Sequence, residues 1–254
     1  RLLESLEREH PLLVLVTDED NSPWTRRCLR QADRILYVAG GGGDAALSEM
    51  EQSLNAQGVF NPMVRAELVR VLPDDARAPS GTLAWLTPRR IDAHHHVRLG
   101  VPSDFARLAR RVTGRPFGVA LSGGSARGMA HLGLLRALRE AGVPVDVVAG
   151  TSAGAILGAQ YARGDEPEAI AERMIALLRT GIVDPTLPIV ALLAGRRYTR
   201  LLQRLFGDGL AEDTWLPFYA VSADLISAEV VVHDRGPLWL AARASSSLPG
   251  VMPP

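Results

Sequence analysis

The sequence contains no lysine: all 28 of its basic residues are arginine. This absence excludes any mechanism that depends on a lysine base or on a Schiff base. Cysteine is almost absent as well, and the single Cys28 excludes an internal disulfide and a cysteine-based zinc cluster. The 28 basic residues are matched by 28 acidic ones, so the chain has no net charge with which to attract nucleic acid.

Long apolar runs are missing too. None reaches the roughly 18 residues that a membrane-spanning helix needs, and the opening Arg1-Leu2-Leu3-Glu4 lacks the pattern of a secretory signal. The first residue is not methionine, and we expect further segments upstream of it. A lone cysteine fits a reducing compartment. We therefore predict a cytoplasmic protein and leave peripheral membrane contact open.

The composition is that of a folded globular protein, with 47% hydrophobic and 22% charged residues. Short apolar runs alternate with segments of helical periodicity, which predicts an α/β fold. We place a domain boundary near residues 113–116, between an accessory α/β region (1–112) and a core (113–254). We expect strands over residues 12–17, 34–39, 66–72, 117–122, 145–149, 217–222 and 229–233. We expect helices over residues 25–32, 45–54, 103–112 and 127–141, from 154 to 163, and from 165 onward.

The turn Gly150-Thr151-Ser152-Ala153-Gly154 lies between a predicted strand and a predicted helix. A Gly-x-Ser-x-Gly in this context is typical of a nucleophile elbow. The turn is so tight that side chains two residues before and two residues after the serine would collide. It would lift the Ser152 hydroxyl clear of the sheet, at the positive end of the following helix. The alternative is a plain turn whose small residues serve close packing.

A second glycine-rich stretch, Gly123 to Gly128, also follows a predicted strand and precedes a predicted helix. Its successive N–H groups can converge on one oxyanion, as the tetrahedral intermediate of acyl transfer requires. Two nucleotide-binding interpretations compete with this one. A Walker A loop needs a lysine, which the chain lacks. A dinucleotide fingerprint would be interrupted at Ser125, and its acidic partner would be Asp146, which opens the next strand instead of closing it.

Together the two stretches resemble the patatin-like phospholipase family. The resemblance rests on residues 118–133, with Gly123-Gly124-Ser125-Ala126-Arg127-Gly128 inside them, and on the turn Gly150–Gly154. It implies a patatin-like mixed sheet flanked by helices, a lipid acyl-ester substrate and a Ser–Asp dyad. It also implies that the core chemistry uses no cofactor and no metal.

The resemblance also implies roles for individual residues. Ser152 takes the position of the nucleophile, and the backbone of Gly123, Gly124 and Ser125 takes that of the oxyanion hole. Arg127 stands at the family's basic position beside that loop. Ser125 replaces a frequent glycine, a departure that should be tolerated if only its N–H is used.

Four further segments resemble the neuropathy-target-esterase type of patatin-like protein. They are residues 24–33, 206–208, 215–218 and 243–250. Members of that subfamily are (lyso)phospholipases, often with cyclic-nucleotide-binding-like domains upstream. The partners implied are a phospholipid or lysophospholipid substrate and a membrane surface contacted peripherally, with no nucleic acid.

The aspartate of the dyad is the main departure from the family. In the family this aspartate lies in an Asp-Gly-Gly or Asp-Gly-Ala motif, shortly after a Ser-x-x-Pro-Gly segment. Neither Asp-Gly-Gly nor Asp-Gly-Ala occurs in the sequence. We expect this aspartate beyond Pro254, and we expect the 254 residues alone to be nearly inactive, because an unassisted serine is a poor nucleophile near neutral pH. The alternative is a catalytically silent regulatory or scaffold module.

Several other residues suggest chemistry, but simpler interpretations are favoured. We expect His94-His95-His96 to lie in a solvated loop, because three consecutive histidines cannot all point one way. We expect His131 to be a packed, hydrogen-bonded residue and not a catalytic base. Arg107, Arg110 and Arg111 are expected to form a solvated basic face of one helix.

Overall fold

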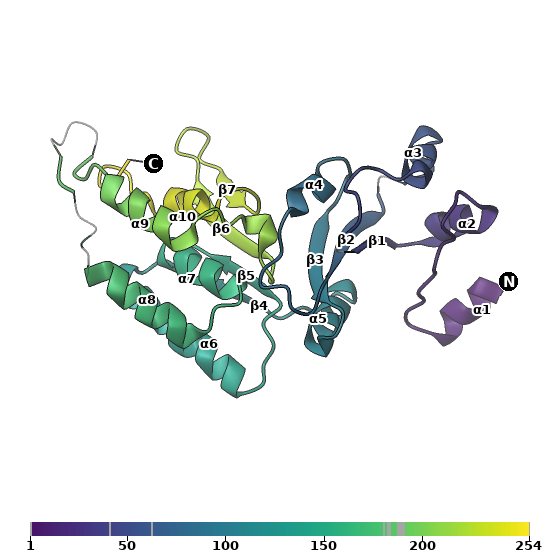
Figure 1. The fold of residues 1–254 in the computed structure, drawn as a ribbon, viewed down its shortest axis with the longest axis horizontal. Helices are drawn as coiled ribbons and strands as arrows, with labels where there is room; N and C mark the ends of the chain where they lie inside the picture. Colours follow the sequence, from purple (N-terminus) through teal and green to yellow (C-terminus); the bar gives the residue numbers. More distant parts are fainter. Residues whose placement is uncertain are drawn as a thin grey trace. The chain divides into compact units, whose positions relative to one another are not determined.

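A computed structural model of the chain describes residues 2–40, 42–61, 63–179, 181, 184–186 and 191–253 (Figure 1). The chain divides into two compact units, Arg1–Val69 with Leu83–His94, and Arg70–Thr82 with His95–Pro254. The strands form two sheets, in the spatial orders β1–β2–β3 and β4–β5–β6–β7. Helices alternate with these strands, so the α/β class predicted from the sequence is confirmed.

The first sheet consists of β1 (Arg34–Gly40), β2 (Arg65–Leu72) and β3 (Ala93–Arg98). The helices of this part of the chain are α1 (Leu2–Glu9), α2 (Pro23–Gln31), α3 (Glu49–Ala56), α4 (Thr82–Leu86) and α5 (Pro102–Val112). Helix α2 begins where the Ser22 hydroxyl accepts a hydrogen bond from the N–H of Thr25, with proline at the first helical position. Cys28 is buried on this helix and is a small core residue.

The second sheet consists of β4 (Gly118–Leu121), β5 (Val147–Gly150), β6 (Phe218–Ala223) and β7 (Val230–His233). The first three of these strands run parallel, and β6 and β7, which correspond to the strands expected over 217–222 and 229–233, form an antiparallel hairpin. The accompanying helices are η1 (Ser125–Met129), α6 (Ala130–Glu140), α7 (Ala153–Ala162), α8 (Pro167–Arg179), α9 (Arg196–Phe206), η2 (Ala211–Asp213) and α10 (Leu238–Ser246).

Helix α7 forms the centre of the second unit. Its residues from Gly154 to Gln160 are all buried, and it contacts β4, β5 and β6 together with α6, α8 and α10. A helix that is apolar on all sides is stable only when neighbours cover it all round. Small residues permit this approach: a Cβ added at Gly158 would lie only 2.9 Å from Val148 Cγ1. The core therefore fixes the helix that follows the Gly150–Gly154 turn.

The strand predicted over residues 12–17 is wrong. These residues lie outside the strands, and the apolar side chains of Leu12, Val14 and Val16 are 56%, 79% and 76% exposed. The carbonyl of Val16 accepts a hydrogen bond from Trp24 Nε1 (2.9 Å) instead of bonding to a neighbouring strand. An apolar run forms a strand only where another strand satisfies its backbone.

Two helix starts also differ from the prediction. The helix expected from residue 45 begins at Glu49, because Ser48 and Glu51 form a capping box. Helix α5 begins at Pro102, one residue before the expected start at residue 103, and Val101 is its N-cap residue. Helices α1, α4, α9 and α10 and strand β3 were not predicted.

The histidine run and the arginine face are corrected as well. His95 and His96 are buried in β3 and not in a solvated loop. The two ring nitrogens of His96 lie 2.9 Å from Thr82 Oγ1 and 2.9 Å from the Thr214 carbonyl, so this buried ring is hydrogen-bonded on both sides. Arg107 is not solvated either, because it pairs with the buried Asp104 at 3.0 Å.

Candidate active site

The two glycine-rich turns leave the same edge of the second sheet. Strands β4 and β5 are parallel, with Leu121 opposite Gly150, and β6 continues the same direction with Ala220 opposite Gly150. The turn after β4 and the turn after β5 therefore start side by side, at the carboxyl ends of their strands. In open α/β sheets this edge is where ligands bind.

Ser152 has a strained backbone conformation. Its φ of 54° and ψ of −118° lie in a region that residues with a side chain rarely adopt. The flanking glycines explain how the turn closes: a Cβ at Gly150 would lie 2.4 Å from the Gly154 carbonyl oxygen, and a Cβ at Gly154 would lie 2.0 Å from the Leu121 oxygen. Both contacts are with backbone, which cannot move aside, so no residue larger than glycine fits at either position.

The serine stands at the start of α7. Its carbonyl accepts hydrogen bonds from the N–H groups of Ala155 (3.0 Å) and Ile156 (3.2 Å), which makes Ser152 the N-cap of the helix. The side chain is half-buried. The positive end of the helix dipole therefore lies at this residue and favours negative charge on its hydroxyl oxygen.

The loop after β4 lies against the serine. A Cβ at Gly123 would lie 3.3 Å from Ser152 Cβ and 4.0 Å from its Oγ. At Gly128 a Cβ would lie 2.7 Å from Ala153 Cβ, so the absence of a side chain lets η1 pack onto the first residue of α7. The structure thus brings the predicted oxyanion segment and the predicted nucleophile together.

Ser125 shows what the departure from glycine involves. Its φ is 51°, in the left-handed region that favours glycine. A serine there costs on the order of 1 kcal/mol of strain. Its neighbour Arg127 is exposed, and the Arg127 N–H donates to the Gly124 carbonyl (3.0 Å), which closes the turn.

His131 is hydrogen-bonded, as predicted, but it is only half-buried. Its Nε2 lies 2.9 Å from the carbonyl oxygen of Ser122, and a carbonyl can only accept, so Nε2 carries the proton. The ring therefore holds the first residue of the glycine-rich loop.

A contact that the sequence analysis missed involves Ser245 of α10. The N–H of Ser152 donates to Ser245 Oγ (2.8 Å), and this hydroxyl donates to the carbonyl of Val221 on β6 (2.5 Å). Ser245 lies in the segment 243–250. The subfamily resemblance pointed to this segment but implied no role for Ser245.

Asp146, the acidic residue of the dinucleotide interpretation, has a structural role in the fold. It is fully buried and accepts hydrogen bonds from Arg110 Nε (2.8 Å), Arg110 Nη2 (2.6 Å) and the Phe117 N–H (2.9 Å). Burial alone would raise the pKa of Asp146, but these hydrogen bonds outweigh it and hold the pKa below its ordinary value. The carboxylate therefore serves as an anchor for α5 and β4 and not as a ribose ligand.

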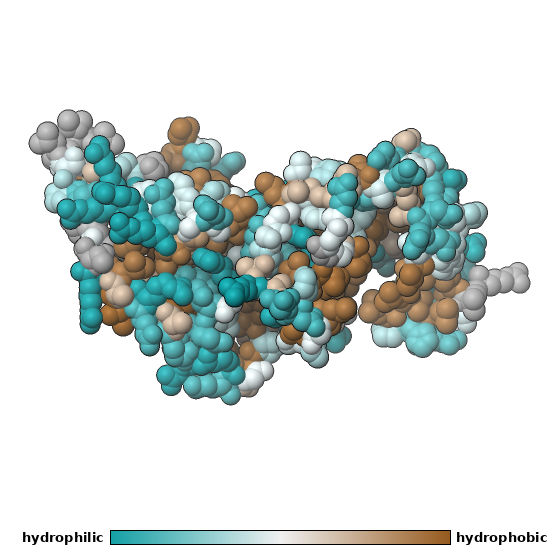
Figure 2. Space-filling view, in the orientation of Figure 1, coloured by the Kyte–Doolittle hydropathy of each residue, from teal (hydrophilic) through white to brown (hydrophobic). Residues whose placement is uncertain are grey.

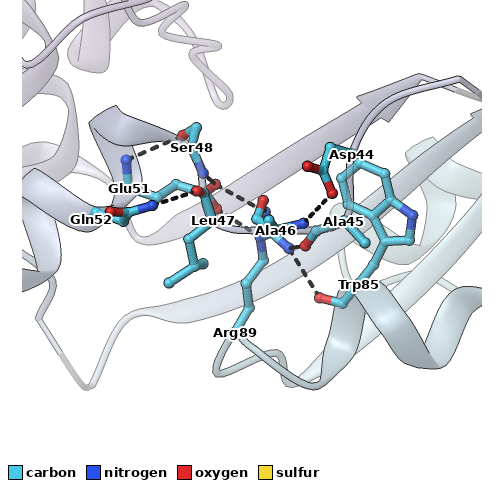
Figure 3. A network of polar contacts seen from close by, with 9 residues as sticks. All are labelled: Asp44, Ala45, Ala46, Leu47, Ser48, Glu51, Gln52, Trp85 and Arg89. Atoms are coloured by element: carbon cyan, nitrogen blue, oxygen red, sulfur yellow. Dashed lines mark hydrogen bonds and ion pairs between the residues drawn. The ribbon is translucent and has the colours of Figure 1, made fainter.

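The turn after β1 is also unsuited to a phosphate (Figure 3). Arg89 donates to Glu51 Oε1 (2.6 Å) and Oε2 (2.9 Å) and to the carbonyls of Ala45 (2.8 Å) and Ala46 (3.0 Å). Burial alone would raise the pKa of Glu51, but hydrogen bonds from Arg89 and from the Ser48 N–H outweigh it and lower the pKa. The turn directs oxygen atoms inward, where an anion would need donors.

The described residues offer neither a metal site nor a membrane-spanning helix. Within residues 2–40, 42–61, 63–179, 181, 184–186 and 191–253, no three His, Cys, Asp or Glu side chains are grouped so that they could hold a metal ion. Among the helices of the same ranges, none combines the length and the apolar character that crossing a bilayer requires.

Comparison with known proteins agrees with this geometry. Residues 119–254 match the family described as patatin-like phospholipase, and residues 1–103 match the Neuropathy Target Esterase family P-loop like domain. The first match covers the second sheet with both glycine-rich turns. The match to the P-loop like domain covers residues 1–103, which include the turn after β1 and the Arg89 side chain bound in it.

Similar full-length proteins include three from different animals. The chain is 36% identical to patatin-like phospholipase domain-containing protein 6 of Homo sapiens, over 99% of this chain and 20% of that protein. It is 36% identical to patatin-like phospholipase domain-containing protein 7 of Rattus norvegicus, over 96% of this chain and 20% of that protein. It is 34% identical to neuropathy target esterase sws of Drosophila grimshawi, over 99% of this chain and 19% of that protein.

The chain thus spans about a fifth of the length of the curated relatives it matches. More than half of it matches one family, and that half contains the strained serine, its two flanking glycines and the glycine-rich loop beside it. The chain belongs to the patatin-like phospholipase family, in its neuropathy-target-esterase-like branch.

Proposed function

We propose that the protein containing these residues hydrolyses acyl esters of phospholipids or lysophospholipids, with Ser152 as its nucleophile. The observation that carries the proposal is the placement of a serine in a strained turn, capped onto a buried helix and touching a glycine-rich loop at Gly123. Such a turn holds a hydroxyl where an acyl carbon can approach it. The relatives named as phospholipases and esterases point in the same direction.

The proposed reaction has two steps. The Ser152 oxygen attacks the ester carbonyl, and its proton passes to a base. The carbonyl oxygen becomes an oxyanion that the N–H groups of Gly123, Gly124 and Ser125 stabilise. The intermediate then expels the alcohol, which takes up a proton, and leaves an acyl-enzyme. Water attacks the acyl-enzyme and releases the fatty acid and the free serine.

We propose that the base is an aspartate, as in a Ser–Asp dyad. The sequence has no Asp-Gly-Gly and no Asp-Gly-Ala, so the aspartate would be supplied from outside residues 1–254. The 254 residues alone would then hydrolyse esters only weakly. Losing the partner of an activated nucleophile typically costs several orders of magnitude in rate.

We also propose the assignment of the two parts of the chain. Residues 113–254 would supply most of the hydrolase core, and residues 1–112 would act as an accessory region. The family matches at 119–254 and 1–103 support this boundary. Within the second unit, Asp213 accepts hydrogen bonds from the N–H groups of Gly81 (3.2 Å) and Thr82 (3.0 Å), so part of the accessory region would buttress the core.

Peripheral contact with a membrane is proposed through the β6–β7 hairpin. Leu225 is 72% exposed and Ile226 is 99% exposed at its tip, where Figure 2 shows an apolar protrusion. Because β6 runs parallel to β5, this tip extends from the same sheet edge as Ser152. Burial of apolar side chains at the boundary between headgroups and acyl chains favours peripheral membrane binding. We expect Ile226→Asp to weaken cosedimentation with phosphatidylcholine vesicles, while hydrolysis of a short soluble ester is kept; unchanged cosedimentation would exclude this contact.

A fluorophosphonate probe and a p-nitrophenyl ester test the activity. We expect the full-length protein to hydrolyse the ester and to be labelled at Ser152, and we expect Ser152→Ala to abolish both. The 254-residue chain should be nearly inactive. Equal activity in all three proteins would contradict the proposal.

The second candidate is a catalytically silent regulatory or scaffold module. The absence of Asp-Gly-Gly and Asp-Gly-Ala within the sequence is the observation that favours it. The same probe distinguishes the hydrolase from the silent module: a full-length protein that folds but is not labelled by the fluorophosphonate would be the silent module. We further propose, from the subfamily alone, cyclic-nucleotide-binding-like domains upstream, which the gene sequence would reveal.

A further inference from the structure

The backbone N–H of Ser152 is bound by a side chain that lies far away in the sequence. Ser245 Oγ accepts from this N–H at 2.8 Å, across 93 residues of sequence. The same oxygen donates its own proton to the carbonyl of Val221 at 2.5 Å. One hydroxyl thereby joins three elements: the elbow, the carboxyl end of β6 and the last turn of α10.

The geometry of this hydroxyl is fixed and not adaptable. A serine hydroxyl has one proton and two lone pairs, and here the proton is used toward Val221. One of the lone pairs must then face the Ser152 N–H. The rotor cannot turn away without losing both hydrogen bonds at once. Helix α10 itself is fixed, because Ala241 and Ala242 are buried and the helix contacts both α7 and β6.

The elbow needs such a support. A residue at φ 54° and ψ −118° is strained, and such a conformation persists only where its surroundings over-determine it. The glycines at 150 and 154 make the turn sterically allowed, but they supply no force that holds the Ser152 peptide in place. The hydrogen bond from its N–H supplies that force at the residue whose side chain must be aimed.

We propose that Ser245 is a positioning residue of the hydrolase, which aims the Ser152 hydroxyl by holding the N–H of the same residue. This inference rests on the proposed function. It has one consequence for the oxyanion: the N–H of Ser152 is engaged with Ser245, so the charge must be stabilised by other donors, a role proposed above for the segment Gly123–Ser125, which lies against the Ser152 side chain at Gly123.

The test uses the full-length protein with Ser245→Ala, and Ser247→Ala as the matched control. Ser247 lies at the end of the same helix, but its hydroxyl bonds to Arg243 and not to the elbow. For Ser245→Ala we expect kcat for p-nitrophenyl ester hydrolysis and the rate of fluorophosphonate labelling to fall about 10- to 100-fold, the usual result of a misplaced reacting group. We expect KM to stay within twofold, and Ser247→Ala to keep both rates within twofold.

A purely structural serine would give a different pattern. If Ser245→Ala labels at the wild-type rate, or if Ser247→Ala loses as much as Ser245→Ala, the positioning role is overturned. Should Ser245→Ala fail to fold, Ser245→Cys replaces it, because a thiol is nearly the same size but a weak hydrogen-bond acceptor; wild-type labelling of that variant also overturns the inference. If Ser152→Ala is still labelled, the proposed function fails and the positioning role with it.

Discussion

Two turns of this chain follow a strand, contain glycine and lead into a helix: residues 122–128 after β4, and residues 42–48 after β1. In the first, Gly123 lies against the side chain of Ser152 and remains exposed. In the second, the guanidinium of Arg89 fills the inner side and is bound by the carbonyls of Ala45 and Ala46 (Figure 3). Glycine content does not separate a candidate active site from a structural turn; what lies opposite the turn does.

The physical difference is one of polarity. A turn whose oxygens face a buried guanidinium is closed to an anion, because its negative partial charges already surround a cation. A turn that borders the proposed nucleophile, at the positive end of a helix, favours an anion instead. The glycines of the Ser152 turn, which lies beside the first turn, differ from those after β1 as well: a Cβ at Gly42 would meet nothing within 4 Å, whereas a Cβ at Gly150 or Gly154 would strike backbone.

The largest effect is expected where a side chain would meet that backbone. In Gly154→Ala, the new Cβ would lie 2.0 Å from the Leu121 oxygen, and the strand and the helix would have to separate. We expect a loss of more than about 3 kcal/mol in the free energy of unfolding, at the upper end of overpacking effects. Denaturant unfolding measures it, and Gly42→Ala is the control, expected to change stability by less than about 0.5 kcal/mol. Similar stabilities for the two variants would remove the steric basis of the comparison.

A smaller effect is expected in the turn after β1. Arg89→Ala leaves Glu51 buried without its cation, which typically costs about 3 kcal/mol where a buried pair is broken. We expect unfolding of this unit at lower denaturant and fluorophosphonate labelling of Ser152 within twofold of wild type in the full-length protein. A large fall in labelling would show that this turn contributes to the active site after all.

The pH dependence sharpens the second prediction. The pKa of Glu51 is lowered in the folded state, so its contribution to stability is fully present above the ordinary glutamate pKa of about 4.3 and is lost as the pH falls through the folded pKa. The difference in stability between wild type and Arg89→Ala should therefore shrink below about pH 4. A difference that is constant from pH 7 to pH 3 would mean that the charge pair is not its source.

The smallest effect is expected at the proposed nucleophile, Ser152. Ser152→Gly removes the Cβ from a φ of 54°, whereas Ser152→Ala keeps it. We expect the glycine variant to be more stable than the alanine variant by about 1 kcal/mol, because glycine adopts this conformation without strain. Thermal unfolding of the two variants checks it. Equal stabilities would mean that the elbow holds no strain at this residue.

Local signals in the sequence predicted much of this molecule. Strand–turn–helix context around Gly150–Gly154 and Gly123–Gly128 predicted both turns, and apolar spacing predicted the strands β1, β2, β4, β5, β6 and β7. Such features are predictable because collisions at Gly150 and Gly154 involve neighbours within a few residues or on the adjacent strand. The family resemblance was equally accessible, since it is carried by contiguous motifs.

Other features were decided only by tertiary structure. The run at 12–17 has the composition of a strand but no partner strand, and His96 is buried because Thr82 and Thr214 satisfy its ring from two distant segments. Ser245 reaches Ser152 only because α10 packs onto α7 and β6. The sequence determined which turns could form, through local sterics. Packing between distant segments determined which polar atoms meet, because a hydrogen bond depends on positions in space that residue spacing does not encode.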